Sequence, residues 1–174
     1  PVAWWRMGED DDPNGTTITD LAAVTGDTLV TNGTFDSDAS GWTGGYSPTL
    51  SSEGGRLKMV NSLTVGIAMQ TVTVEVGKSY EVSAELIPSA GTATDLRFVL
   101  GTTTYGTQYY DSGAVTSDTT ITRYITATTT GLYLDLRNAS AASTVAYFDN
   151  VTVRQVNGNP ATLVNGPTFS TDTS

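Results

Sequence analysis

The stretch "SYEVSAEL", residues 79–86, alternates apolar and polar side chains with a period of two residues. One face of an extended chain would carry the apolar side chains Tyr80, Val82, Ala84 and Leu86. This period is typical of a β-strand that is buried on one side and solvated on the other. The stretch therefore predicts an antiparallel sheet with one face against a hydrophobic core.

The same alternation recurs along the middle of the chain, and turn-forming residues separate the stretches. It is found in "SLTVGIAMQ" (62–70), "TVTVEV" (71–76), "DLRFVLG" (95–101), "TITRYITAT" (120–128), "GLYLDLRN" (131–138) and "VAYFDNVTVRQV" (145–156). Between the first two of these the apolar positions shift by one residue, which predicts a bulge or bend at Gln70–Thr71. Short strands spaced by turns predict an all-β chain, folded as an antiparallel β-sandwich.

Composition supports this fold and excludes several functions. The 174 residues include 32 Thr and 18 Gly, which suit pleated surfaces and turns. The net charge of −10, with only two Lys, disfavours nucleic acid and anionic membranes as partners. Because Cys and His are absent, disulfides, the usual zinc sites and His-based catalysis are excluded. The only catalytic arrangement that would remain is a pair of carboxylates on either side of a cleft, as in glycosidases. Only Asp135 lies on a strand expected to line a cleft, so we expect no enzyme.

No signal peptide is visible, and no apolar run approaches the ~20 residues that span a bilayer. The strand series predicts a domain over residues 29–156, between an N-terminal arm (1–28) and a C-terminal arm (157–174). The N-terminal arm holds Asp10, Asp12 and Asn14 in the first half of a calcium-loop pattern, but Leu21 stands where the final Glu belongs. A solvent-exposed acidic turn is therefore the favoured interpretation.

The arms also carry the aromatic residues Trp4, Trp5 and Phe169. These side chains are too apolar to be left in water. We expect them to pack on another subunit, or on each other beside the sandwich.

Four motifs follow one another in a recognisable order: "LVTNGTFDSDASGW" (29–42), "GGRLKMV" (54–60), "VEVGKSYEVSAEL" (74–86) and "FDNVTV" (148–153). In this order they resemble the family 4/9 type of carbohydrate-binding module, over roughly residues 29–156. The resemblance implies a jelly-roll β-sandwich, a structural calcium ion and a glycan-binding cleft on the concave sheet. Large apolar side chains should fill its core, namely Trp42, Phe98, Leu134 and Leu136.

The resemblance also implies ligands for the calcium ion, which would tie the 29–42 loop to the last strand. Carried over by position, these are the backbone carbonyls of Thr34 and Gly55 and the carboxylate of Asp149. Calcium takes about six to eight oxygens, so waters or Asp36 would complete its shell. The alternative is that Asp149 caps a turn or pairs with Arg154.

Six residues match the positions that line the family's cleft: Tyr46, Gln70, Arg97, Tyr105, Tyr133 and Asp135. Aromatic rings stack on the C–H face of a sugar, while amide, guanidinium and carboxylate groups bond its hydroxyls. The alternative is a structural module on which the tyrosines only cover the surface. Trp42 is expected in the core rather than in the cleft.

The two arms resemble the edges of laminin-G/concanavalin-like segments in structural proteins of marine phages. We therefore predict a non-catalytic virion surface protein, either a tail-fibre or adhesin module or a capsid decoration protein. Its partners would be glycans of the host or environment, together with other virion subunits or further copies of this chain, and neither nucleic acid nor membrane. The alternatives are a structural virion protein with a vestigial cleft, and a carbohydrate-binding module of a secreted glycoside hydrolase.

Overall fold

The computed structural model describes residues 17–18, 24–156 and 161–162. Within these ranges the elements are β-strands, apart from one short 3-10 helix, η1 (Pro88–Ala90). No helix in the described part of the chain is long and apolar enough to cross a membrane. The prediction of an all-β chain is thus confirmed.

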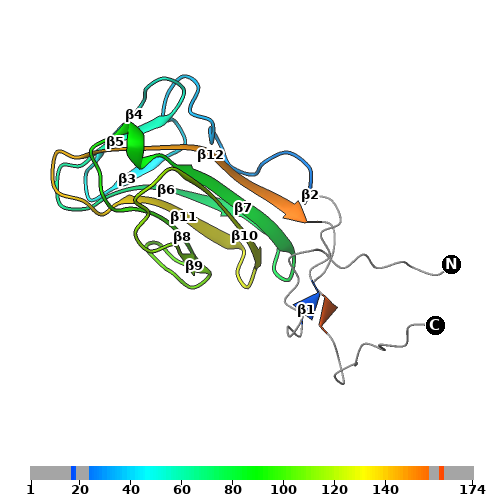
Figure 1. Cartoon of the computed structure of the whole chain (residues 1–174). Coiled ribbons are helices and arrows are strands. Elements are labelled where there is room, and N and C mark those ends of the chain that lie inside the picture. Colours follow the sequence, from blue (N-terminus) through cyan, green and yellow to red (C-terminus); the bar gives the residue numbers. More distant parts are fainter. Residues whose placement is uncertain (1–16, 19–23, 157–160, 163–174) are drawn as a thin grey trace, which may run out of the picture.

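Most of the strands form two antiparallel sheets that lie face to face as a sandwich (Figure 1). The first, called here the six-stranded sheet, has the order β10-β7-β12-β5-β4, with β2 paired to the end of β12. Its strands are β10 (Thr119–Thr126), β7 (Ser79–Leu86), β12 (Val145–Val156), β5 (Leu57–Val60), β4 (Thr49–Ser52) and β2 (Val24–Thr25). "SYEVSAEL" is thus a central strand of this sheet.

The second, called here the five-stranded sheet, has the order β3-β6-β11-β8-β9. Its strands are β3 (Thr43–Gly45), β6 (Gly66–Thr73), β11 (Gly131–Asn138), β8 (Leu96–Gly101) and β9 (Tyr110–Asp111). This two-sheet arrangement is the predicted jelly-roll sandwich.

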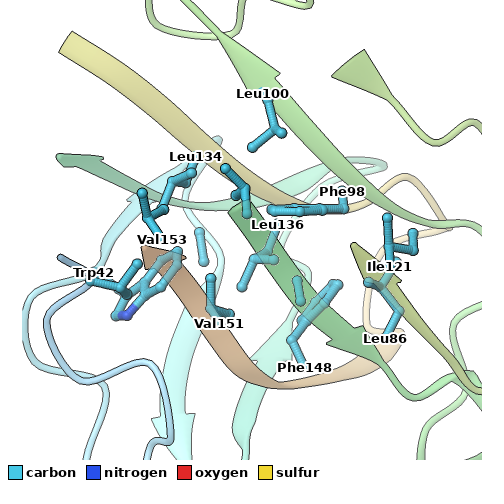
Figure 2. Close-up of a cluster of buried hydrophobic side chains, with 14 of the residues drawn as sticks. Trp42, Leu86, Phe98, Leu100, Ile121, Leu134, Leu136, Phe148, Val151 and Val153 are labelled. Atoms are coloured by element: carbon cyan, nitrogen blue, oxygen red, sulfur yellow. The ribbon is translucent and has the colours of Figure 1, made fainter. Parts of the chain in front are cut away.

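The core lies between the two sheets and is filled by buried apolar side chains (Figure 2). Phe98, Leu134 and Leu136 are fully buried, and Trp42 keeps 8% of its surface exposed. The Trp42 ring lies 5.5 Å from that of Phe35, and its indole N–H donates to the Asn32 carbonyl at 3.2 Å. The predicted burial of these four side chains, with Trp42 as a core anchor, is confirmed.

The predicted bulge at Gln70–Thr71 is wrong. Strand β6 pairs with β11 without interruption, from Gly66 opposite Asn138 to Thr73 opposite Gly131. The apolar positions shift by one residue in the sequence because Ile67 on β6, which faces away from the core, is nevertheless 98% buried. An apolar residue that is buried on the outward face of a strand produces the same sequence pattern as a bulge.

An irregularity in the pairing occurs instead on β12, between Asp149 and Thr152, where Asn150 has a φ of 50°. The 29–42 loop is fastened to β12 at this point. The Val151 N–H donates to the Gly33 carbonyl at 2.9 Å, and the Leu29 N–H donates to the Val153 carbonyl at 2.8 Å. A Cβ on Gly33 would lie 2.0 Å from the Val151 carbonyl oxygen, so only glycine allows this approach.

Two pairings extend beyond the expected 29–156 domain. Strand β2 pairs with Gln155 and Val156, so the six-stranded sheet includes residues of the segment expected to be the N-terminal arm. Strand β1 (Thr17–Ile18) pairs antiparallel with β13 (Ala161–Thr162), which brings together one piece of each arm. The acidic turn and the aromatic residues Trp4, Trp5 and Phe169 lie outside the described residues.

Candidate functional site

The outward face of the five-stranded sheet presents three rows of side chains, set by the strand register. Read from β6 through β11 to β8, the rows are Ile67, Arg137 and Arg97; Met69, Asp135 and Val99; and Thr71, Tyr133 and Gly101. Their neighbours along each strand point into the core, since successive side chains alternate between faces. The rows therefore form the floor of any site on this face.

The loop that joins β8 to β9, residues 102–109, folds back over this floor. The Arg137 guanidinium donates to the Tyr105 carbonyl at 3.1 Å, and a Cβ on Gly101 would lie 2.4 Å from the Gly106 carbonyl oxygen. Val99 and Asp135 are consequently buried although they face outward. The 102–109 loop thus converts part of a solvent face into an enclosed surface.

Two tyrosines from opposite edges of the sheet meet above the floor. Tyr46 follows β3 and Tyr105 belongs to the 102–109 loop, and their ring centroids lie 5.3 Å apart with a 40° tilt. Both have a left-handed backbone, with φ of 60° for Tyr46 and 62° for Tyr105. Bulky side chains rarely adopt this conformation, and such strain gathers at functional positions. Both rings remain partly exposed, so the pair offers an aromatic surface to a ligand.

Two hollows lie on this face. The first encloses about 390 Å³ and is lined by Tyr46, Leu63, Thr64, Val65, Ile67, Tyr105 and Arg137. The second encloses about 240 Å³ and is lined by Gly41, Thr43, Met69, Gln70, Thr71, Thr104 and Tyr133. Aromatic and aliphatic groups with a few polar atoms are the usual lining of small-molecule sites.

The charged groups of the floor are paired. Arg137 donates to the Asp135 carboxylate at 2.9 Å, and burial raises the pKa of Asp135 while the hydrogen bond and charge of Arg137 oppose that rise. The Nε of Arg137 is buried without a hydrogen-bond partner among the described residues. A buried donor without a partner costs about 1–3 kcal/mol, and because this atom is covered it is not itself a contact for a ligand.

A second ion pair lies one strand away in the same row. Arg97 binds both oxygens of Asp95 at 2.8 Å, and this hydrogen bonding raises the pKa of Arg97. Arg97 lines neither of the two hollows. Its guanidinium is therefore directed to its own carboxylate partner rather than to the enclosed space.

Gln70 differs from its expected place on the cleft floor. It lies opposite Leu134 on the core-facing side of β6, and its amide forms hydrogen bonds with the 29–42 loop. Its oxygen accepts the Thr31 N–H at 2.8 Å, and its nitrogen donates to the carbonyls of Thr31 at 2.9 Å and Gly41 at 3.2 Å. These bonds use most of its hydrogen-bonding capacity, so Gln70 shapes the wall of the second hollow and has little left for a ligand.

Four of the six expected cleft residues thus line the hollows: Tyr46 and Tyr105 the first, Gln70 and Tyr133 the second. Asp135 lies beneath the surface, with 2% of it exposed, and holds Arg137 instead of lining a hollow. Arg137 is the charged lining residue that the sequence did not lead us to expect. The alternation Tyr133, Asp135, Arg137 along one strand face could have identified it.

The expected calcium position lies at the other sheet, where β12 meets the 29–42 loop. Burial raises the pKa of Asp149, and the negative charges of Glu85 and Asp36 add to that rise, while the Asn150 N–H and Arg56 oppose it. Asp149 and Glu85 are half-buried and Asp36 is exposed, and carboxylates that repel one another in this way are a feature of cation sites. The Oδ1 of Asp149 accepts the Asn150 N–H at 2.7 Å, as the turn-capping alternative expects, and no ion pair joins Asp149 to Arg154 among the described residues.

The other expected ligands lie close to this position in the fold. Thr34 donates to the Asp36 carboxylate at 2.8 Å, and Gly55 lies in the turn before Leu57, which pairs with Phe148. No three acidic side chains of the described residues gather closely enough to hold a metal ion by themselves. The donor set therefore fits calcium only if backbone carbonyls and waters supply most of the oxygens.

The sandwich is similar to solved structures of carbohydrate-binding modules. A family 4 module has a TM-score of 0.55 at 16% identity, covering 72% of this chain and 99% of its own. The CBM22-1 xylan-binding domain of Paenibacillus barcinonensis Xyn10C has a TM-score of 0.57 at 20% identity, covering 79% and 99%. At such identities the likeness establishes the fold alone.

A further similar structure is the enzymatically active domain of tailspike protein 4 from bacteriophage CBA120. Its TM-score is 0.54 at 10% identity, and the match covers 74% of this chain and 21% of that one. No protein-family model and no curated protein matches the sequence. The described chain thus contains a jelly-roll β-sandwich with the fold of carbohydrate-binding modules.

Proposed function

We propose that the outer face of the five-stranded sheet binds a neutral oligosaccharide. The observation that carries this is the pair of partly exposed tyrosines, Tyr46 and Tyr105, beside a hollow that Arg137 also lines. The rings would stack on the C–H face of a sugar, while guanidinium and tyrosine hydroxyl groups would bond its hydroxyls. Because Arg137 is paired with Asp135, the site has little net charge and favours a neutral ligand.

The site is suited to binding and not to hydrolysis. Glycoside hydrolysis needs two carboxylates about 5–10 Å apart on either side of the bond. Among the described residues that line the two hollows there is neither Asp nor Glu. The nearest buried carboxylate, Asp135, is held by Arg137.

Calcium is proposed as a structural ligand, held by Asp149 with Asp36 and the carbonyls of Thr34 and Gly55. It would neutralise the carboxylates that raise the pKa of Asp149. Bound there, it would fasten the 29–42 loop to β12. Such a role concerns stability, since Asp149 and the Tyr46–Tyr105 pair belong to different sheets.

The proposed setting is a virion surface, where the chain would attach to glycans of the host or environment. The support is the resemblance of the arms to phage structural proteins, together with the likeness of the sandwich to part of a tailspike. The genes beside this one would test the setting. Virion genes would support it, whereas a catalytic glycosidase domain in the same chain would contradict it.

Titration calorimetry of the full chain tests the binding itself, with xylan, β-glucan and host-polysaccharide oligosaccharides as probes. Dissociation constants of about 10 µM to 1 mM are expected, because hydroxyl bonds largely replace bonds to water. Tyr46→Ala should weaken binding about tenfold, the loss of roughly one stacking contact.

The matched control is Tyr124→Ala on the six-stranded sheet. Tyr46 and Tyr124 are 53% and 45% exposed, so the two substitutions remove similar exposed rings. Tyr124→Ala should leave the affinity unchanged. Absence of heat with every probe, or an equal loss in the two variants, would contradict the proposed function.

A further inference from the structure

We propose that Tyr105 determines the length of glycan that is bound, by lying as a bar across the outer face of the five-stranded sheet. The bar separates the two hollows, so the site accepts a short oligosaccharide or the end of a chain and excludes an extended polysaccharide. This inference rests on the proposed glycan binding and adds the ligand's length to it.

The Tyr105 ring packs against Gly45 on β3. A Cβ on this residue would lie 2.8 Å from the Tyr105 hydroxyl and 3.1 Å from its Cε1. The backbone of Gly45 does not have the positive φ that would itself call for glycine. Glycine is therefore needed here for space, and the Tyr105 side chain fills that space.

The bar spans the sheet. Its backbone is fixed over β11 by the bond from Arg137 to the Tyr105 carbonyl, while its ring reaches β3 at the edge. The loop is braced by its own bonds, from the Gly106 N–H to the Thr103 carbonyl at 2.9 Å and from the Thr102 N–H to Gln108 at 3.0 Å. The ring thus belongs to a folded loop that is bonded to the floor.

The two hollows share no lining residue, and the 102–109 loop contributes to each of them. Tyr105 itself lines the first hollow, beside Ile67, whereas its neighbour Thr104 lines the second, beside Thr71. Volumes of about 390 and 240 Å³ are at or below the lower end of small-molecule sites, which enclose roughly 300–1,000 Å³. Each hollow therefore has room for about one or two sugar rings.

The test is calorimetry of the full chain with xylo- and cello-oligosaccharides from disaccharide to hexasaccharide. In the unmodified protein the affinity should rise to about the trisaccharide and then level off. Gly45→Val should displace the Tyr105 ring, so the affinity should continue to rise with length and the hexasaccharide should bind about tenfold more tightly. Ser51→Val, at an exposed position of β4, is the matched control and should keep the original profile.

Tyr105→Ala provides a second route, because it removes the bar without adding a side chain to β3. It should weaken binding of the disaccharide and abolish the plateau with length. An affinity that already rises steadily to the hexasaccharide, or a Gly45→Val profile equal to that of Ser51→Val, would overturn the inference.

One measurement separates this inference from the proposed function. In ligand-free protein, an NMR nuclear Overhauser contact should connect the Tyr105 ring protons with the Hα protons of Gly45. Its absence would overturn the bar even if glycans bind. Failure of every glycan to bind, with the contact present, would overturn the proposed function and with it the role of the bar in selecting ligands.

Discussion

The outer faces of the two sheets differ although the same strand alternation produces both. On the six-stranded sheet the outward side chains include small hydroxyls that bond across strands, such as Ser83 with Thr122 at 3.3 Å. On the five-stranded sheet the outward Val99 and Asp135 are buried under the 102–109 loop. One face is a plain solvated surface, and the other has a floor, a cover and hollows.

The difference teaches that a single loop can turn one of two similar faces into a site. The covered face carries an ion pair that is almost withdrawn from water and two tyrosines in a left-handed backbone. Both features are costly, and neither is needed to close the core. We therefore propose that the five-stranded sheet binds the ligand and that calcium on the six-stranded sheet serves stability.

The largest expected effect concerns the covered ion pair. Arg137→Ala should lower the free energy of unfolding by about 3 kcal/mol, because it leaves the buried Asp135 carboxylate unpaired. Arg97→Ala, at the register partner of Arg137, should cost less than about 1 kcal/mol, since the Arg97–Asp95 pair is more exposed. Urea unfolding measures both, and equal losses would mean that the loop does not shield the floor.

The second effect concerns calcium. Calcium at 100 times its dissociation constant should stabilise the chain by about 2.7 kcal/mol, by mass action on the native state. Chelation should therefore lower the melting temperature, and Asp149→Ala should abolish that response. Asp27→Ala, which removes an exposed acid of the same charge, should leave it intact. An unchanged melting curve in chelator would remove calcium from the account.

A smaller effect is the pH dependence of the chelated protein. The pKa of Asp149 is raised by burial and by Glu85 and Asp36, so the folded state holds its proton more tightly than the unfolded state. That contribution is fully present below the unfolded pKa of about 3.9 and is lost as pH rises through the raised value. Without calcium, Asp149→Asn should therefore flatten the gain in melting temperature between pH 7 and 4. A gain as steep as in the unmodified protein would contradict this.

The smallest effect belongs to the solvated face. Ser83→Ala removes one exposed cross-strand hydroxyl bond on the six-stranded sheet. Thermal unfolding should show a change of no more than about 0.5 kcal/mol, as for most surface substitutions. A loss comparable to that of Arg137→Ala would mean that the two outer faces are not as different as their burial indicates.

Strand identity and the core were predictable because they follow from local alternation. "SYEVSAEL" and "GLYLDLRN" both fold as strands, with Leu86, Leu134 and Leu136 buried. The 29–42 loop was expected to lock onto the end of the chain, and its bonds to β12 do this. Period-two patterns report which residues share a face, and burial of one face then fixes the sheets.

The details of the site were not predictable because they depend on tertiary contacts. Ile67 faces outward and is nevertheless buried, which gave the false sign of a bulge at Gln70–Thr71. Gln70 has the right chemistry for a sugar, yet its register places it against the 29–42 loop. Only the folded chain shows that Asp135 is withdrawn behind Arg137, and that Gly45 leaves space for Tyr105.

The assignment of binding to the covered face is tested most directly by NMR chemical-shift mapping of the full chain with xylohexaose and cellohexaose. Binding should change the amide chemical shifts of residues in and around the first hollow, namely Tyr46, Thr64, Tyr105 and Arg137. Residues of the second hollow should also shift if a sugar occupies it. Residues of the outer face of β7 and β10 should not shift. Saturable shifts on β7 and β10, or none at Tyr46 and Tyr105 while either sugar binds, would contradict the account.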